Sequence, residues 1–402
     1  MNVAPEVMPP SGLVYVVWEV TLQCDLACKH CGSRAGKPRS DELSTEEALD
    51  VVRQIAEMGA VEITLIGGEA YLREDWPVIA RAIKDHGMQC TMTTGGRNMT
   101  PERARQVKEA GIDNVSVSID GIGATHDTQR GVKGSFDAAV AALDNLVAAG
   151  CTATVNTQIN KLSFHELDQV LDILIAKKLH AWQVQLTVPM GRAADRPEWL
   201  LQPDDILEVT PKLAELAVRG AKNGVHMWPG NNIGYFGPHE TTLRGRAVRT
   251  DRHWSGCTAG KHTLGIESDG AIKGCPSLPT SQYVGGHTRE RPIRDIWDST
   301  KELRFTRDRT SEDLWGFCKT CYYADECRAG CTWTSHVFFG KPGNNPYCHH
   351  RALEHQRLGQ RERLVRVEAA PGLPFDHGRF DIVVEPLDAP REIAPRRLPL
   401  LT

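Results

Sequence analysis

Apolar and polar positions follow two rhythms through the first half of the chain. Short apolar runs at 14–20, 61–66, 88–94, 114–119, 152–159 and 182–188 have the character of strands. Between them, apolar residues recur at helical spacing at 44–58, 75–86, 135–149 and 164–177, and a further helix begins at Thr100. Strands that alternate with helices favour parallel pairing with right-handed crossovers. The pattern predicts six β/α units, too few for a closed eight-stranded barrel.

Three cysteines follow the first strand at C-x3-C-x2-C spacing, namely Cys24, Cys28 and Cys31. Cysteine thiolates hold iron–sulfur clusters, and a four-iron cluster takes four ligands. Three thiols would leave one iron open to a ligand that is not protein. A closed structural zinc site would normally complete a set of four ligands, and chance spacing is the remaining alternative.

A second group of seven cysteines occupies 92 residues: Cys257, Cys275, Cys318, Cys321, Cys327, Cys331 and Cys348. Cysteines at this density in a reducing compartment are more often metal ligands than disulfides. A pair of zinc ions is the structural alternative to iron–sulfur clusters. Of the other two cysteines, Cys90 lies within a predicted strand and Cys151 at the start of another. We expect neither to take part in chemistry, since free cysteine packs as a small hydrophobe.

Composition, net charge and the lack of long apolar runs limit the classes of protein to which the chain can belong. The chain has 402 residues, 41% of them hydrophobic, which is enough for a barrel and a smaller second domain. The net charge of −4 gives no reason to expect nucleic acid as a partner. No apolar run approaches the roughly 20 residues that cross a bilayer, and residues 1–12 lack the pattern of a signal peptide. We therefore expect a cytoplasmic enzyme with no membrane partner.

Polar groups gather where the predicted strands end, which is where parallel barrels place their chemistry. They are Gly67, Gly68 and Glu69 after the second strand, Ser118 and Asp120 at the end of the fourth, and Arg130 shortly beyond it. Polar residues also alternate within the fifth and sixth strands, at Asn156, Gln158, Gln185 and Thr187. One side of each strand must therefore line a polar lumen. Ordinary turns and a solvated surface arginine are the alternatives for the strand-end groups.

The cysteine loop and the strand-end groups together resemble the radical S-adenosylmethionine (radical SAM) family. The resemblance implies an open barrel of six β/α units with a [4Fe–4S] cluster on Cys24, Cys28 and Cys31. In that family the open iron binds the amino and carboxylate groups of S-adenosylmethionine. Ala70 departs from the proline that most relatives have after Gly-Gly-Glu.

The same resemblance implies roles for the cofactor-binding residues. His30 would lie beside the adenine, and Gly67, Gly68 and Glu69 would accept the methionine amino group. Ser118 and Asp120 would reach the ribose hydroxyls. Arg130 would lie near the methionine carboxylate or the substrate.

The second group of cysteines resembles the SPASM extension of this family, which holds two auxiliary [4Fe–4S] clusters. If the ligand positions of the family are carried over to this sequence, the distal cluster is bound by Cys318, Cys321, Cys327 and Cys348. The near cluster takes Cys257, Cys275 and Cys331. Its fourth iron position is either open, which we expect, or bound by an unusual ligand such as His262. The run 189–193 also resembles a loop of relatives that carry the extension.

The resemblance divides the chain into five parts. We expect an N-terminal segment at 1–13, a partial radical SAM barrel at 14–224, a bridging loop at 225–250, a SPASM domain at 251–355 and a C-terminal tail at 356–402. Beyond residue 350 we expect a solvated basic helix that carries Arg351, Arg357, Arg361, Arg363 and Arg366, followed by a disordered proline-rich tail. The bridging loop, rich in Gly, Asn and aromatic residues, is expected to contact substrate.

The chemistry that the resemblance implies is reductive cleavage of S-adenosylmethionine to a 5′-deoxyadenosyl radical. With two auxiliary clusters, we expect an oxidative cross-link on a ribosomally synthesised precursor peptide, and an electron donor of the flavodoxin or ferredoxin type. The alternatives are a tailoring enzyme for a tetrapyrrole or quinone precursor, and an electron carrier without turnover.

Two features limit the peptide hypothesis. In sulfatase-maturing relatives an aspartate follows the second auxiliary cysteine, whereas here Pro276 follows Cys275, so the catalytic base is unassigned. Few residues precede the first strand, and we expect either a separate leader-recognition protein or direct docking of the leader.

Overall fold

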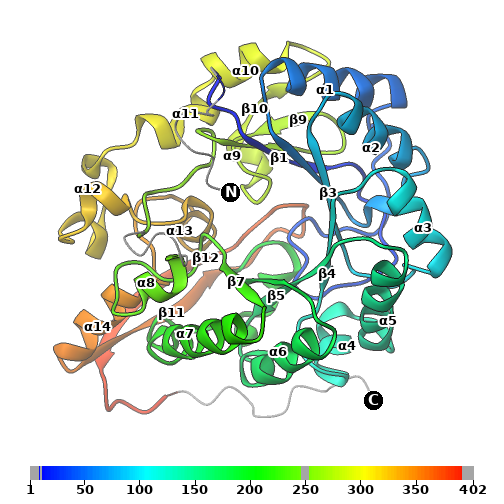
Figure 1. Ribbon diagram of the computed structural model, residues 1–402. Coiled ribbons are helices and arrows are strands. Elements are labelled where there is room, and N and C mark those ends of the chain that lie inside the picture. Colours follow the sequence, from blue (N-terminus) through cyan, green and yellow to red (C-terminus); the bar gives the residue numbers. More distant parts are fainter. Residues whose placement is uncertain (1–8, 10, 246–252, 392–402) are drawn as a thin grey trace.

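Six parallel strands form the centre of one sheet in the computed structural model, which describes residue 9 and residues 11–245 and 253–391. They are β1 (Tyr15–Glu19), β2 (Glu62–Ile66), β3 (Gln89–Thr94), β4 (Asn114–Ser118), β5 (Ala153–Ile159) and β6 (Ala181–Leu186). Neighbours in sequence are neighbours in the sheet, and every pair is parallel. The predicted order of six β/α units is therefore confirmed (Figure 1).

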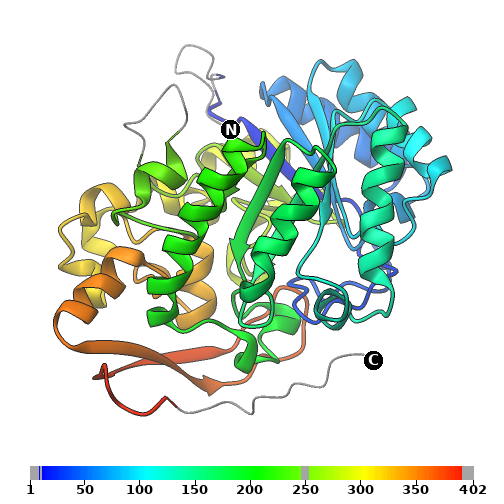
Figure 2. The ribbon, with the colours of Figure 1, turned by 60° about the horizontal axis from the view of Figure 1, so that its bottom comes forward.

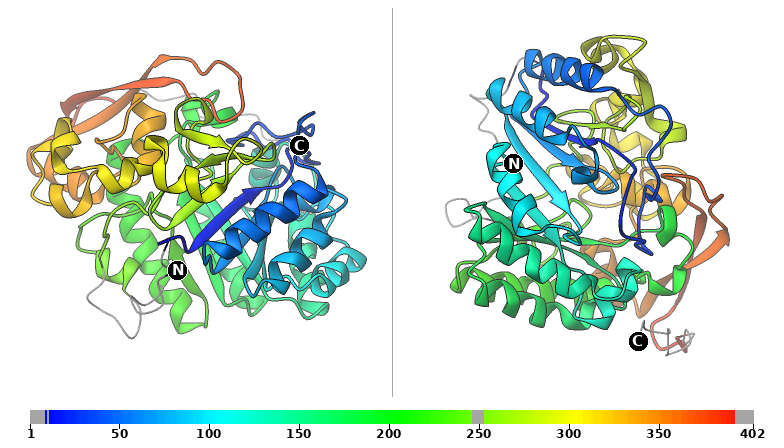
Figure 3. Two further views of the ribbon diagram at one scale, coloured as in Figure 1. Left: turned by 90° about the horizontal axis from the view of Figure 1, so that it is seen from above. Right: turned by 90° about the vertical axis from the view of Figure 1, so that its right-hand side faces the viewer.

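Helices cover the outside of these strands (Figures 1 and 3). They are α1 (Thr45–Glu57), α2 (Trp76–Asp85), α3 (Pro101–Glu109), α4 (Ala124–Arg130), α5 (Ser135–Ala148), α6 (Leu167–Ala176) and α7 (Ile206–Lys222). Helix α1 begins with a capping box in which Ser44 and Glu47 bind each other's backbone N–H groups. Helix α4 was not expected from periodicity, because all its residues from Thr125 to Arg130 are buried and mostly polar.

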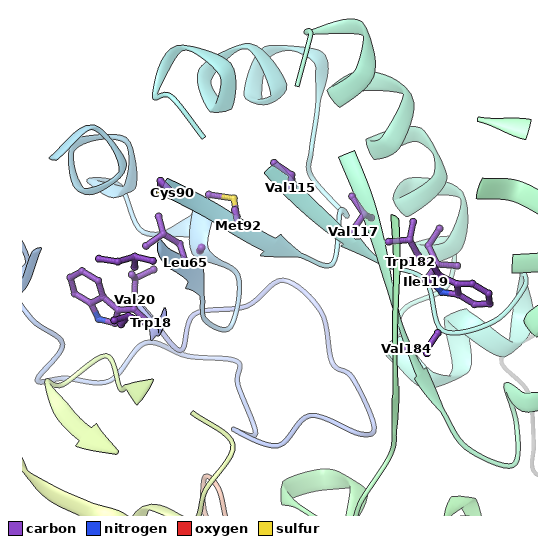
Figure 4. Packing of buried hydrophobic residues seen from close by; sticks show 14 of the residues in the cluster. Trp18, Val20, Leu65, Cys90, Met92, Val115, Val117, Ile119, Trp182 and Val184 are labelled. Carbon is purple, nitrogen blue, oxygen red and sulfur yellow. The ribbon is translucent and has the colours of Figure 1, made fainter. Parts of the chain in front are cut away.

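The two faces of the sheet differ in polarity, because side chains alternate along each strand. One face packs against the helices through apolar residues that include Trp18, Leu65, Met92, Val117 and Trp182 (Figure 4). The other face carries polar groups that bond from strand to strand, such as Thr64 to Thr91 at 2.7 Å and Ser118 to Asn156 at 3.0 Å. Gln158 and Gln185 are register partners on that face. The polar lumen predicted from the alternation is thus present.

The sheet continues beyond β6 and β1 at both edges. Strand β7 (His226–Pro229) pairs in parallel with β6. At the other edge, β8 (Thr263–Ile266) pairs in parallel with β1, followed by the antiparallel β9 (Ala271–Lys273) and β10 (Val284–His287). The two cysteine-bearing parts of the chain therefore share one ten-stranded sheet.

The prediction of a bridging loop at 225–250 is wrong in part. It contains β7 and the short helix α8 (Glu240–Arg244), and Asn232 donates to the Leu186 carbonyl at 2.8 Å. The four residues of β7 are too few for a recognisable alternation, and its backbone bonds to β6 create the strand. Residues 246–250 of this prediction lie outside the described residues.

The second domain is built from short helices around its cysteines. They are α9 (Thr280–Tyr283), α10 (Ile293–Ser299), α11 (Lys301–Asp308), α12 (Ala324–Cys327), α13 (Thr332–Phe339) and α14 (His349–Arg357). Single 3₁₀ turns occur at Ala70–Leu72, Phe164–Glu166, Gly191–Ala193, Pro197–Trp199, Pro203–Asp205, Ser311–Asp313 and Gly316–Lys319. None of the helices in the described ranges is both long and apolar enough to cross a membrane.

The prediction of a solvated tail at 356–402 is wrong over its described part, because an antiparallel hairpin replaces it. The hairpin consists of β11 (Gln360–Glu368) and β12 (Arg379–Pro386), and it runs along one side of the molecule (Figure 2). Arg351, expected on a solvated helix, is buried and forms a bidentate ion pair with Glu362 at 2.6 Å. Residues 392–402 of the predicted tail lie outside the described residues.

Candidate functional site

The loop of Cys24, Cys28 and Cys31 lies between β1 and α1 and is held from two sides. Lys29 donates its N–H to the Gln129 carbonyl of α4 at 2.7 Å. The Arg192 N–H donates to the Cys31 carbonyl at 3.0 Å. The loop is thus fixed between α4 and the loop that follows β6, at the carboxyl ends of the parallel strands.

The three thiols of this loop are free and close enough to influence one another. Burial raises the pKa of Cys24 to about 12, and the neighbouring Cys28 and Cys31 raise it further. Burial also raises the pKa of Cys28, against the effect of the Arg130 guanidinium. Such thiolates need a compensating positive charge, which a metal centre supplies. The donor set therefore suits an iron–sulfur cluster.

The Gly67-Gly68-Glu69 turn packs directly on the backbone that precedes Cys24. The Gly68 N–H donates to the Thr21 carbonyl and the Glu69 N–H to the Gln23 carbonyl, each at 2.7 Å. A Cβ at Gly68 would collide with the Gln23 carbonyl. The glycines are therefore required for contact between two backbone segments, a reason that their sequence did not reveal.

Glu69 is a buried carboxylate with one free oxygen. Its Oε2 accepts the Gly95 N–H at 2.9 Å, while Oε1 has no hydrogen-bond partner among the described residues. Burial raises the pKa of Glu69 to about 8, and only the hydrogen bonds and Arg130 oppose that rise. A buried acceptor of this kind suits an amino group as its missing partner.

Asp120, His30 and Arg130 form one ion-paired group beside Cys28. Asp120 Oδ2 lies 3.1 Å from His30 Nε2 and 2.6 Å from the Arg130 guanidinium. Arg130 also donates to the Cys28 sulfur at 3.7 Å. Burial would raise the pKa of Asp120, but Arg130 and His30 hold it well below its usual range. Three predicted site residues are therefore in contact, although they come from three separate segments.

These contacts bear on the ribose role expected for Ser118 and Asp120. The Ser118 hydroxyl donates to Asn156 Oδ1 at 3.0 Å, and Asp120 Oδ1 accepts the Gln158 N–H at 2.8 Å. Both side chains are buried and engaged within the protein. Their contact with a ribose stays a prediction, whereas their role in positioning neighbours is visible.

The four thiols predicted for a distal cluster line one hollow. It is lined by Cys318, Cys321, Cys327 and Cys348 together with apolar and aromatic side chains. All four cysteines are free. In the described part of the chain, no three His, Cys, Asp or Glu side chains are arranged to hold a single metal ion. The arrangement suits a cluster, which occupies volume, better than a zinc ion.

Cys257, Cys275 and Cys331 form the near set of thiols. Cys257 and Cys275 pack around Leu278 and Tyr283. Burial raises the pKa of Cys331 to about 12, with Cys257 and Cys275 raising it further, so the three are neighbours. His262, considered as a fourth ligand, has its Nδ1 2.9 Å from the Gly12 carbonyl oxygen. This contact is consistent with an open fourth position, which stays a prediction.

Several residues near these sites were not identified from the sequence. Tyr235 is buried, and its hydroxyl accepts the Cys331 N–H at 3.1 Å. The loop between β11 and β12 lies over the cysteine loop, where the Phe375 N–H donates to the Gly32 carbonyl at 3.0 Å. Asp376 in that loop pairs with Arg34 at 2.9 Å. The sequence signal for this hairpin was weak, because residues 361–366 (Arg-Glu-Arg-Leu-Val-Arg) show no regular alternation of apolar and charged positions.

Comparison with known families agrees with this architecture. Residues 18–174 match the radical SAM superfamily, and residues 257–322 match an iron–sulfur cluster-binding domain called SPASM. These two regions contain the first cysteine loop and the start of the second cysteine group, including Cys257, Cys275, Cys318 and Cys321.

Similar proteins of known name fall into more than one group. An AdoMet-dependent heme synthase of Methanosarcina barkeri is 29% identical over 84% of this chain and 96% of its own length. A mycofactocin maturase MftC of Mycobacterium tuberculosis is 27% identical over 96% of this chain and 94% of its own. The chain therefore spans nearly the full length of both relatives.

Solved structures share the fold at low identity. Streptococcus suis SuiB bound to the precursor peptide SuiA superposes with a TM-score of 0.66 and 15% identity, over 82% of this chain and 74% of SuiB. The enzyme anSMEcpe with bound AdoMet superposes with a TM-score of 0.66 and 16% identity, over 85% and 95% of the two chains. With both domain matches and this fold, the chain is a radical SAM enzyme with a C-terminal SPASM domain.

Proposed function

We propose that the protein oxidatively modifies a ribosomally synthesised precursor peptide, by cross-linking it, with S-adenosylmethionine as the source of the radical. The observation that carries the proposal is the contact between the near thiols and the barrel mouth. Helix α13 begins next to Cys331, and its Trp333 donates to the Met190 sulfur at 3.0 Å. Met190 belongs to the loop whose Arg192 binds the Cys31 carbonyl. A substrate at this junction would face a radical source and an electron acceptor.

Similarity supports a peptide as that substrate. The match to the mycofactocin maturase covers 96% of this chain and must therefore reach into the β11–β12 hairpin. The match to the AdoMet-dependent heme synthase covers 84%. A precursor peptide is also bound in the structure of SuiB, which has the same fold.

The residues of the barrel mouth divide the cofactor functions among them. Cys24, Cys28 and Cys31 would hold the first cluster, which with S-adenosylmethionine supplies the 5′-deoxyadenosyl radical. Glu69 would accept the methionine amino group through its free oxygen. Asp120 orients His30 and Arg130, which would place their free nitrogens beside the cofactor.

The thiols of the second domain would hold two further clusters, making three in all. The near set lies beside the junction described above, where an electron released by substrate oxidation must be accepted. The distal hollow has an apolar lining, and Tyr322 beside Cys321 is 90% exposed. We propose that electrons enter or leave there, exchanging with a flavodoxin or ferredoxin-type protein.

The second candidate is modification of a tetrapyrrole. The observation in its favour is that the AdoMet-dependent heme synthase of Methanosarcina barkeri matches over 96% of its own length. A further relative in that organism is an Fe-coproporphyrin III synthase, 26% identical over 83% of this chain. Both candidates use the same cluster sites and differ only in what occupies the junction.

A competition between the two substrate classes tests the proposal. The reconstituted protein is incubated without oxygen with S-adenosylmethionine, a reductant, and either a deuterated peptide encoded beside its gene or iron coproporphyrin. We expect deuterium in 5′-deoxyadenosine and a peptide product lighter by a pair of hydrogens, measured by mass spectrometry. Conversion of the porphyrin alone would replace the peptide proposal with the second candidate.

A further inference from the structure

Three titratable side chains meet beside the near thiols, and none has been given a role above. Tyr283 of α9 packs with Cys257 and Cys275. Its hydroxyl lies 3.0 Å from Nδ1 of His336 on α13. The His336 ring in turn meets the ring of His377 edge-on, at 90° and 5.1 Å between centroids. These residues come from three separate segments, so the fold alone brings them together.

His336 has an unused ring nitrogen in a buried position. The residue is 4% exposed, and Nε2 has no hydrogen-bond partner among the described residues. Buried polar atoms are nearly always hydrogen-bonded. We therefore expect Nε2 of His336 to bond to a group that the described residues do not supply. When Nδ1–H donates to the Tyr283 oxygen, Nε2 carries a lone pair that can take a proton.

The position of His336 places it where the substrate is expected. His377 belongs to the loop between β11 and β12, and it forms a β-bridge with Met190. The same loop donates from Phe375 to the Gly32 carbonyl, next to Cys31. On its other side, the Phe375 ring covers the buried Lys273, whose Nζ is 3.8 Å from the ring centroid. His336 therefore lies between the first cysteine loop and the near thiols.

The surroundings keep the imidazole neutral. Burial, together with the nearby His377 and Arg309, lowers the pKa of His336 to about 4. The titratable or charged groups that face it are thus Tyr283, His377 and Arg309, and no carboxylate contributes to the shift. At neutral pH the ring is therefore uncharged, and the nitrogen that carries no hydrogen has a free lone pair.

We propose that His336 takes the proton released when the peptide radical closes its bond, an inference that rests on the proposed function. A C–H bond of the peptide has given its hydrogen atom to the 5′-deoxyadenosyl radical, and an X–H bond of the same peptide then breaks as the C–X bond forms. The proton goes to His336 Nε2, and the one electron left over would be taken up by the iron–sulfur cluster that the near thiols would hold. Tyr283 and His377 are positioning residues that orient the ring.

The first test separates hydrogen abstraction from bond closure. Wild type, His336→Gln and the control His165→Gln, an exposed histidine, are compared with deuterated peptide. We expect all three to place the same deuterium in 5′-deoxyadenosine and to contain the same iron and sulfide. The amount of cross-linked product per 5′-deoxyadenosine should fall about a hundredfold in His336→Gln only, as for loss of a general base. An unchanged ratio would overturn the inference.

Further variants guard against a purely structural effect. Imidazole added to His336→Ala should restore part of the product ratio, because a small base can replace the lost ring. Tyr283→Phe, which keeps the ring but loses the oxygen that orients Nδ1, should give an intermediate ratio. Failure of imidazole to rescue a variant with full cluster content would contradict the role as base.

A structure with peptide bound gives a measurement independent of turnover. We expect the X–H group of the peptide within about 3.2 Å of His336 Nε2, the reach of a general base. A peptide whose reacting atoms lie beyond one bridging water would overturn the inference while leaving the proposed function intact. A wild-type protein that transfers no deuterium from any peptide would overturn the proposed function and this inference with it.

Discussion

At the scale of single residues, Asp120 connects the cluster loop to the cofactor site. Its carboxylate lies between His30, which is part of the cysteine loop, and Arg130, which donates to the Cys28 sulfur. All of these groups are buried or nearly so. A buried cation that loses its partner is costly, whereas an exposed ion pair contributes little.

Asp120→Asn should therefore lower the free energy of unfolding by about 3–5 kcal/mol, because it leaves Arg130 buried without its counter-charge. Glu102→Gln is the matched control, since it breaks the exposed pair with Arg105 and should cost less than about 1 kcal/mol. Guanidinium denaturation of the two variants measures the difference. Equal losses of unfolding free energy in the two variants would show that the buried Asp120 pair contributes no more to stability than the exposed pair.

The second prediction at the scale of single residues concerns a substitution of Gly68. Its Cα faces the Gln23 carbonyl, so Gly68→Ala must push apart two backbone segments, one of which leads into Cys24. We expect about 1–3 kcal/mol of destabilisation from overpacking and incomplete assembly of the first cluster. Gly36→Ala in the same cysteine loop meets no atom within 4 Å and is the control. Full iron content in Gly68→Ala would contradict this account.

At the scale of elements, the C-terminal hairpin is a structural part of the site. Its loop bonds to the first cysteine loop through Phe375 and to the loop after β6, where Gly191 donates to the Asp376 carbonyl at 2.8 Å. Arg34 adds ion pairs with Asp376 at 2.9 Å and Asp195 at 2.8 Å. One arginine thus joins three segments at the barrel mouth.

Arg34→Ala should loosen this junction without unfolding the barrel. We expect faster hydrogen exchange at the amides of Phe375 and Gly191, by about tenfold if the lost pairs contribute about 1.4 kcal/mol to the closed state. The amides of β2 and β3 should be unaffected. Arg379→Ala, which breaks an exposed pair with Glu368 on the same hairpin, should change neither. Unaltered exchange at Phe375 would mean that the backbone bonds alone hold the loop.

Local patterns predicted the elements that bury a continuous apolar face. The strands β1 to β6 and the helices between them follow this rule. The hairpin was not predicted because charged residues dominate it, two of them buried (Arg361 and Glu362), and because its buried hydrophobic residues are Leu364, Phe375 and Phe380. The strands β7 to β10 are short, and each is a strand because it pairs with its neighbour in the sheet rather than because of its own pattern.

At the scale of the whole molecule, one sheet joins the radical SAM barrel and the SPASM domain. Strand β8 pairs with β1 in register from Tyr15 with Thr263 to Trp18 with Ile266. In this sheet Cys24, Cys28 and Cys31 follow β1, whereas Cys257 precedes β8 and Cys275 follows β9. Sequence spacing predicted both groups, because thiols at these intervals have few other uses. It could not predict the His30–Asp120–Arg130 group or the His336 site, since each depends on segments that meet only in the fold.

The first cysteine set should assemble independently of the other two, because Cys24, Cys28 and Cys31 lie on a segment of the chain that carries none of the other cysteines. If every set binds a four-iron cluster, the reconstituted protein contains about twelve iron and twelve sulfide per chain. Cys24→Ala, Cys28→Ala and Cys31→Ala combined should leave about eight of each and abolish formation of 5′-deoxyadenosine. Cys151→Ala is the control, since that thiol is buried near the Ala104 carbonyl, away from all three sets, and should change nothing. Analysis of iron and sulfide measures the cluster content of each variant, and chromatography measures the 5′-deoxyadenosine that it forms. Continued cleavage of S-adenosylmethionine by the triple variant would place the radical site elsewhere in the molecule.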